Sequence, residues 1–172
     1  GFQTLRGQCG EFILRNNKTP TTQSVQTVSI NSSPLLQFSS TADSGIIAII
    51  SKKVLMQKED KLVFLDDLGN TYTFNILSAR LKQTNPKYKT YEAVVQLNYK
   101  IVELFSKIKI NTIKIVSREK QQVYPSKMFI SQREKLFKVF GCFYATLDPT
   151  LVQDKKIKPY LLSLIHISEP TR

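Results

Sequence analysis

The chain has 172 residues, of which 41% are hydrophobic and 22% are charged, and its formal net charge is +12. This composition is typical of a folded globular domain and excludes an intrinsically disordered chain, while no apolar run reaches the roughly 18 residues of a membrane-spanning helix. The positive charge allows an anionic partner such as nucleic acid, but the lysines are spread along the whole sequence, as on an ordinary solvated surface.

Residues 11–78 alternate short apolar stretches with polar punctuation, a pattern that predicts strands. The run Ile46–Ile50 is apolar on both faces, so we expect a strand covered on both sides. A helix is the competing interpretation of this run, but its β-branched residues and the preceding Gly45 favour a strand. The other predicted strands of this part are residues 11–15, the segment around Val28 and Ile30, and residues 35–38.

A β-hairpin is predicted over residues 62–76. Tyr72, Phe74 and Ile76 alternate with polar residues, and Gly69 with Asn70 can adopt the backbone conformation of a tight turn. The adjacent carboxylates Asp66 and Asp67 allow a second interpretation, as ligands of a divalent cation or as an acid–base pair. We favour a turn-forming role, because neighbouring side chains at a strand end point to opposite sides and no third ligand is near.

The periodicity changes after residue 80. We expect a helix from Thr90 to Ile108, a strand over residues 109–116 with a bulge at Asn111–Thr112, and a second helix that begins at Pro125–Ser126 and ends at Gly141. Residues 143–147 then predict a closing strand. The apolar stripes of the two helices are interpreted as core packing rather than docking grooves, with Phe129, Phe137 and Phe140 in the core.

Tyr88 and Tyr91, next to Lys87 and Lys89, are the one stretch that resembles a base-stacking and phosphate-binding arrangement, although no RNA-binding signature accompanies them. Nucleic-acid binding is therefore the alternative function. Its test is an electrophoretic mobility shift measured over a series of salt concentrations.

Residues 162–172 resemble the translation of a transposon-end sequencing adapter, so we expect the native chain to stop near Leu161 and its first residues to be missing as well. The one histidine, His166, lies in this tail, which leaves no imidazole for a nucleophile–base pair. Cys9 and Cys142 are far apart in sequence and lack further ligands, so we expect neither a zinc site nor a disulfide, and a reducing compartment. No catalytic, cofactor-binding or metal-binding residue is predicted.

The stretch Lys61–Ile76 resembles the penultimate hairpin of the Hydin-type immunoglobulin-like repeats of cilium- and flagellum-associated proteins. The resemblance implies that residues 10–78 are a β-sandwich repeat that binds axonemal or centrosomal proteins without catalysis or cofactor. The same hairpin, with the Ile46–Ile50 run before it, also resembles one blade of a β-propeller, although no second copy follows at the required spacing.

We therefore expect an α+β chain: an antiparallel β-sandwich-like part at 1–80, a mixed part with two amphipathic helices at 81–161, and a non-native tail at 162–172. The expected function is non-catalytic protein–protein interaction or a structural role in a larger cytoskeletal or ciliary polypeptide, in the cytoplasm, with no membrane partner. A fragment of an enzyme whose active site lies outside these residues is the third hypothesis.

Overall fold

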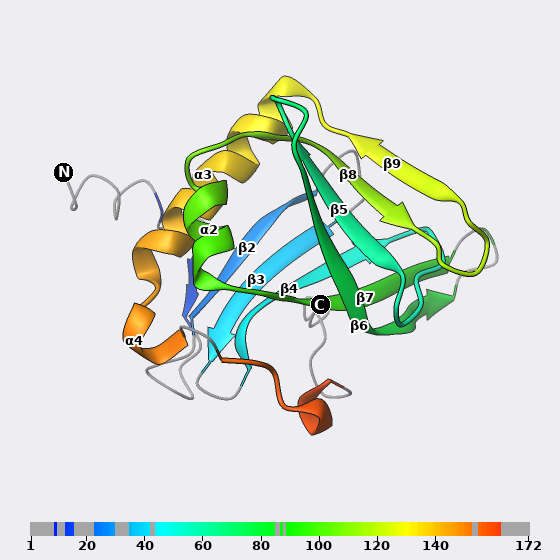
Figure 1. Ribbon diagram of the computed structural model, residues 1–172, viewed down its shortest axis with the longest axis horizontal. Coiled ribbons are helices and arrows are strands. Elements are labelled where there is room, and N and C mark those ends of the chain that lie inside the picture. Colours follow the sequence, from blue (N-terminus) through cyan, green and yellow to red (C-terminus); the bar gives the residue numbers. More distant parts are fainter. Residues whose placement is uncertain are drawn as a thin grey trace.

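The computed structural model describes residues 9, 13–15, 23–29, 35–41, 44–84, 87, 89–152 and 155–162. They form an α+β structure built on one nine-stranded antiparallel sheet (Figure 1). The strand order is β1-β2-β3-β4-β7-β6-β5-β8-β9. The strands are β1 (Ile13–Arg15), β2 (Gln23–Ser29), β3 (Leu35–Thr41), β4 (Gly45–Lys52), β5 (Lys61–Asp66), β6 (Thr71–Thr84), β7 (Lys89–Leu97), β8 (Ile110–Val116) and β9 (Val123–Lys127).

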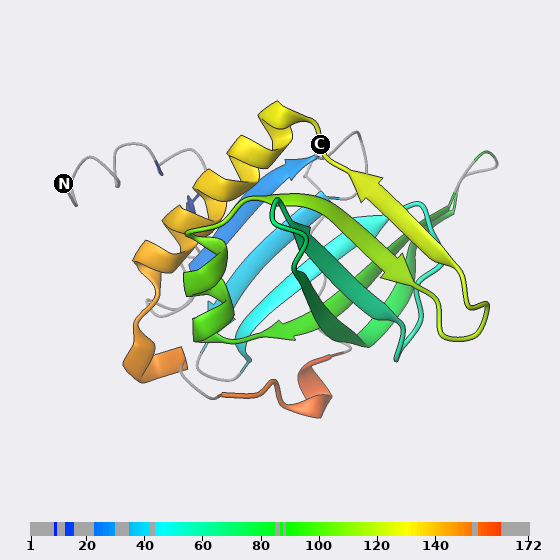
Figure 2. The same cartoon turned by 45° about the horizontal axis from the view of Figure 1, so that its top comes forward.

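Three helices and one 3₁₀ turn complete the described structure: α2 (Tyr99–Phe105), α3 (Ile130–Thr146), α4 (Pro149–Val152) and η1 (Pro159–Leu161). In Figures 1 and 2, α2 and α3 lie together along one side of the sheet. Asn98 caps α2, because its side chain accepts a hydrogen bond from the Ile101 amide at 2.8 Å.

The long strand β6 connects the two halves of the sheet. Its first residues pair with β5, and its later residues pair with β7, with register shifts near Leu77 and Lys82. Irregularities of this kind bend a strand and increase its twist. The strands β5 and β8 consequently run across β3 and β4 in both views (Figures 1 and 2). The predicted boundary near residue 80 therefore falls within a strand.

A single aromatic core joins the two halves of the sheet to the helices. Phe38 of β3 lies 4.6 Å from Phe140 of α3, measured between ring centroids, and Phe105 of α2 lies 5.1 Å from Phe140 and 5.3 Å from Phe64 of β5. All four rings are buried. Offset and edge-to-face ring pairs add stability beyond their buried area, so this cluster fixes the helices against both halves of the sheet.

The other face of β4 and β7 has its own small apolar cluster. Ile47, Ile49 and Val94 pack under Ile157 of the C-terminal segment 155–162. The Ile157 amide donates a hydrogen bond to Gln96 Oε1 at 2.6 Å. The prediction that the 46–50 strand is covered on both sides is thus confirmed, since every residue of β4 is buried.

Two further sequence predictions are confirmed. The hairpin of β5 and β6 pairs Phe64 with Tyr72 and Leu62 with Phe74 across the predicted turn. The strand over residues 109–116 is β8, and its bulge is at Asn111, since Leu65 pairs with Thr112 whereas Asp66 pairs with Ile110.

The helix predicted from Thr90 is wrong over its first half. Residues 89–97 form β7, which pairs with β4 on one side and β6 on the other, and the helix starts only at Tyr99. Two ladders of hydrogen bonds and the buried Val94 and Val95 outweigh a periodicity that also fits a helix.

The limits predicted for the second helix are also wrong. Pro125 and Ser126 belong to β9, where a proline is tolerated because the strand lies at the edge of the sheet. The helix α3 begins at Ile130, continues through Gly141 and ends at Thr146, so residues 143–146 of the predicted strand are helical. The reason is packing: Val139, Phe140 and Phe143 are buried at helical spacing on both sides of the glycine.

Candidate functional site

Asp66 organises the turn between β5 and β6. Its Oδ1 accepts hydrogen bonds from the backbone amides of Leu68 (2.9 Å) and Asn70 (2.8 Å), and its Oδ2 accepts from Asn70 Nδ2 (3.0 Å) and the Tyr72 hydroxyl (2.9 Å). Burial by itself would raise the pKa of Asp66, but the bonds from Asn70, Tyr72 and Leu68 outweigh it and hold the pKa below its usual value. Burial, the hydrogen bond and the charge of Asp66 raise the pKa of Tyr72.

The two adjacent carboxylates do not converge. Asp66 is surrounded by donors within its own turn, whereas Asp67 forms an ion pair with Arg133 of α3 at 2.8 Å. Within the described residues no group of three His, Cys, Asp or Glu side chains can hold a metal ion. The turn-forming interpretation of Asp66 is confirmed, and Asp67 has a second role as a contact to α3.

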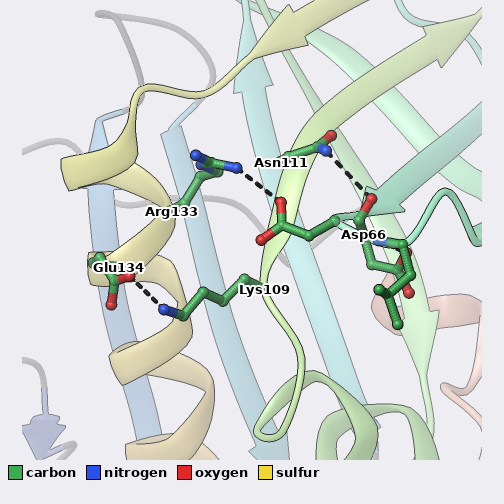
Figure 3. Close-up of polar contacts among 7 residues, drawn as sticks. Asp66, Lys109, Asn111, Arg133 and Glu134 are labelled. Carbon is green, nitrogen blue, oxygen red and sulfur yellow. Dashed lines mark hydrogen bonds and ion pairs between the residues drawn. The ribbon is translucent and has the colours of Figure 1, made fainter.

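Polar contacts join the hairpin turn, the start of β8 and the first turns of α3 (Figure 3). Lys109 forms an ion pair with Glu134, and the Asp67 amide donates a hydrogen bond to the Lys109 carbonyl at 3.1 Å. The bulged Asn111 donates from Nδ2 to the Asp66 carbonyl at 3.3 Å. These contacts, with the Asp67–Arg133 pair, position the turn against the helix.

Three large apolar side chains are exposed around this junction. Leu68, next to Asp67 at the tip of the hairpin, is 84% exposed, while Phe129 and Ile130 at the start of α3 are 64% and 70% exposed. Phe129 and Ile130 lie four and three residues before Arg133, on its side of the helix. We call Leu68, Phe129 and Ile130 the hairpin–helix patch.

The prediction that Phe129 belongs to the core is wrong. Phe129 precedes the first helical residue, and Met128 takes the buried position instead, with its amide bonded to the Asn111 carbonyl at 2.8 Å. Phe140 is buried as predicted, whereas Phe137 is only partly buried and lies under the Lys109 ammonium, 5.6 Å from the ring centroid. The sequence offers one signal for this exposure: the β-branched and aromatic Val123–Tyr124 before Pro125 favour a strand that delays the helix.

Basic residues slightly outnumber acidic ones on the segments beside the hairpin–helix patch. Lys109, Lys127, Arg133 and Lys135 lie on its flanking segments, against the three acids Asp66, Asp67 and Glu134. Asp67 and Glu134 are in ion pairs with Arg133 and Lys109. Exposed apolar side chains with a basic surround are typical of a contact surface rather than of a catalytic pocket.

The predicted stacking and phosphate-binding stretch is not assembled. Tyr91 lies within β7 and packs against the main core, which makes its ring part of the packing rather than a platform for bases. Lys87 and Lys89 are exposed, and Tyr88 lies outside the described residues, as do His166 and the rest of segment 163–172.

The cysteine prediction is wrong. Cys9 and Cys142 form a disulfide, with their Cα atoms 5.5 Å apart and both side chains buried. Their separation of 133 residues hides this proximity in the sequence, because only the folded chain brings residue 9 to α3. Disulfides are typical of oxidising compartments, so the argument for a reducing one fails.

A second titratable cluster joins α2 to α3. The Tyr99 hydroxyl donates to the Tyr144 hydroxyl, which donates to Glu103 Oε2, each at 3.2 Å. The hydrogen bond from Tyr99, burial and the neighbouring Glu103 raise the pKa of Tyr144. These contacts hold the two helices together and leave Tyr144 protonated at neutral pH.

Comparisons with family models, with curated proteins and with solved structures find no match to the chain. Among the described helices, none is both long and apolar enough to cross a membrane.

Proposed function

We propose that this chain is a protein–protein interaction module, and that the hairpin–helix patch is its contact surface. The observation that carries the proposal is the exposure of Leu68, Phe129 and Ile130 around one ion pair. Large apolar side chains that cluster on a folded surface mark interaction sites, and aromatic residues are enriched at the centres of such sites. Binding through this patch requires no catalytic residue.

The partner is a protein segment that combines apolar and acidic side chains. Apolar groups would cover Phe129, Ile130 and Leu68, and carboxylates would face the surrounding lysines. A second copy of the chain fits less well, because each copy has a formal net charge of +12 and would bring like charge to the contact.

The wider setting we propose is a larger cytoskeletal or ciliary protein, in which residues 10–78 contribute a sandwich-like repeat. The support is the resemblance of Lys61–Ile76 to the Hydin-type hairpin. The Cys9–Cys142 disulfide counts against the cytoplasmic location.

The test is a selection of peptides from a random library displayed on phage, followed by affinity measurements. We expect enrichment of peptides that contain apolar residues together with aspartate or glutamate. Replacing both Phe129 and Ile130 with serine should weaken their binding at least tenfold, since a central apolar contact contributes more than about 1 kcal/mol.

Leu81→Ser is the matched control, because Leu81 is also exposed but lies on β6, well beyond the hairpin turn. It should bind the peptides as the parent chain does. An equal loss of peptide affinity in the double variant and in Leu81→Ser would overturn the assignment of this surface. So would peptides that bind the double variant as tightly as the parent chain. A mobility shift of duplex or single-stranded nucleic acid that weakens steeply with salt would favour the nucleic-acid alternative instead.

A further inference from the structure

Lys52 is a lysine in an apolar setting. It follows Ile46, Ala48 and Ile50 on the side of β4 that faces the main core, and only 7% of its surface is exposed. Lysine is seldom buried unless its ammonium is paired. The burial of Lys52 is therefore not that of an ordinary solvated surface lysine, and the contacts of its ammonium must account for it.

The Lys52 ammonium reaches across to β9. Its Nζ is 2.6 Å from Ser126 Oγ and 3.1 Å from the Tyr124 carbonyl oxygen. The described residues include no ion pair to Lys52; the titratable neighbours are Tyr91, opposite it on β7, Tyr124 on β9 and Lys53 next in the chain. Burial without a counter-charge lowers the pKa of Lys52 to about 8.

A hydroxyl and an amine at this distance have the geometry of a nucleophile and its base. A neutral lysine can accept the serine proton, whereas an ordinary lysine is protonated and cannot. Serine–lysine pairs perform the same acyl-transfer chemistry as triads that contain histidine. The Tyr124 carbonyl adds a third group, which orients the amine toward Ser126.

Ser126 is the accessible member of the pair. It lies on β9, the last strand in the sheet order (Figure 2). Its side chain is only partly buried. The amine lies beneath it on the core side. Ser126 shares its face of β9 with Tyr124, which packs against the main core, and its partial exposure leaves the hydroxyl within reach of a small substrate while the base is already in contact with it.

We propose that Ser126 and Lys52 form a nucleophile–base pair for acyl transfer from carboxylic esters, an activity beyond the binding function proposed above. Ser126 Oγ attacks the ester carbonyl carbon while Lys52 Nζ takes the hydroxyl proton. The bond to the leaving alcohol then breaks, and the ammonium returns the proton to the alkoxide. Water attacks the acyl-serine in the same way, which releases the acid and restores both side chains.

The probe is p-nitrophenyl acetate. We expect a burst of nitrophenolate and one acetyl group on Ser126, located by tandem mass spectrometry. The burst rate should rise with pH around a midpoint near 8, where Lys52 loses its proton. Ser126→Ala should abolish the acetylation at this position.

Two substitutions distinguish the role of Lys52 as a base from its contribution to folding. Lys52→Met keeps the length and removes the amine, and Lys52→Arg keeps a charged donor that cannot accept a proton at these pH values. Each should slow acetylation of Ser126 at least about 100-fold while the circular dichroism spectrum stays unchanged. Lys53→Met, the neighbouring control, should react as the parent chain does.

Acetylation of Lys52 itself would overturn the proposal, because the amine would then be the nucleophile. An unmodified Ser126, or a Lys52→Arg variant that reacts at the parent rate with the same pH profile, would overturn it as well.

Discussion

Replacing Gly45 with alanine tests how the C-terminal segment 155–162 lies on the sheet. Gly45 starts β4 with a φ of +63°, and a Cβ built there would be 2.5 Å from the Lys155 carbonyl oxygen. Neither the backbone of β4 nor that of Lys155 can yield without a shift of one element. We expect alanine to displace the C-terminal segment.

Gly69 supplies the matched control. It also has a positive φ, +88°, but nothing lies within 4 Å of a Cβ at this position in the described structure. Alanine in a left-handed conformation costs about 1 kcal/mol, and this cost applies at both glycines. The difference between the two variants then isolates the contact with Lys155.

The size of that difference follows from what the displaced segment loses. Ile157 is 8% exposed and packs on Ile47, Ile49 and Val94, so its release costs about 2 kcal/mol of apolar burial. Its hydrogen bond to Gln96 contributes about 1 kcal/mol more. We expect Gly45→Ala to lower the free energy of unfolding by about 4 kcal/mol and Gly69→Ala by about 1 kcal/mol.

Urea unfolding followed by circular dichroism measures both values. A third variant, Ile157→Ala, strengthens the test, because adding it to Gly45→Ala should cost little once the segment has detached. Equal destabilisation by the two glycine substitutions would refute the reasoning, as would full additivity of Gly45→Ala and Ile157→Ala.

Three further predictions concern bonds that the structure describes elsewhere. Dithiothreitol should reduce the Cys9–Cys142 disulfide and so lower the free energy of unfolding of the parent chain by about 2–5 kcal/mol, while that of Cys9→Ser stays unchanged. Free thiols detected in the denatured, unreduced chain would contradict this. The folded pKa of Asp66 is depressed, so its contribution to stability is present above about pH 4 and is lost as the pH falls through the folded value. In urea unfolding, the free energy of unfolding of Asp66→Asn should fall less at acid pH than that of Asp67→Asn. Equal pH slopes of this free energy in the two variants would contradict the prediction. The folded pKa of Lys52 is also depressed, so between about pH 8 and 10.5 the unfolded chain binds a proton that the folded chain has released. The free energy of unfolding of the parent should therefore rise over this interval relative to that of Lys52→Met. A difference between the two chains that does not change with pH would show that the amine is solvated.

Local patterns predict the structure well where the chemistry is local. The Asp66 turn depends on residues within six positions of each other, and β4 is recognisable from an unbroken apolar run that is rich in β-branched isoleucine. The bulge at Asn111 is likewise visible as a polar interruption in an alternating stretch.

The incorrect predictions fall where contacts between residues distant in the sequence determine the structure. Residues 89–97 carry apolar spacing that fits both a helix and a strand, and only the flanking β4 and β6 select the strand. The exposure of Phe129 depends on where α3 begins, and the sequence has no strong capping residue there. The pairs Cys9–Cys142 and Lys52–Ser126 join residues more than 70 positions apart, which no single-sequence pattern reveals.

Hydrogen exchange of the chain with and without a selected acidic and apolar peptide tests the central claim most directly. The account predicts slower exchange in residues 66–70 and 128–133, the two segments that carry the hairpin–helix patch, and little change elsewhere in the described chain. Protection confined to other segments, with these two unchanged, would contradict it.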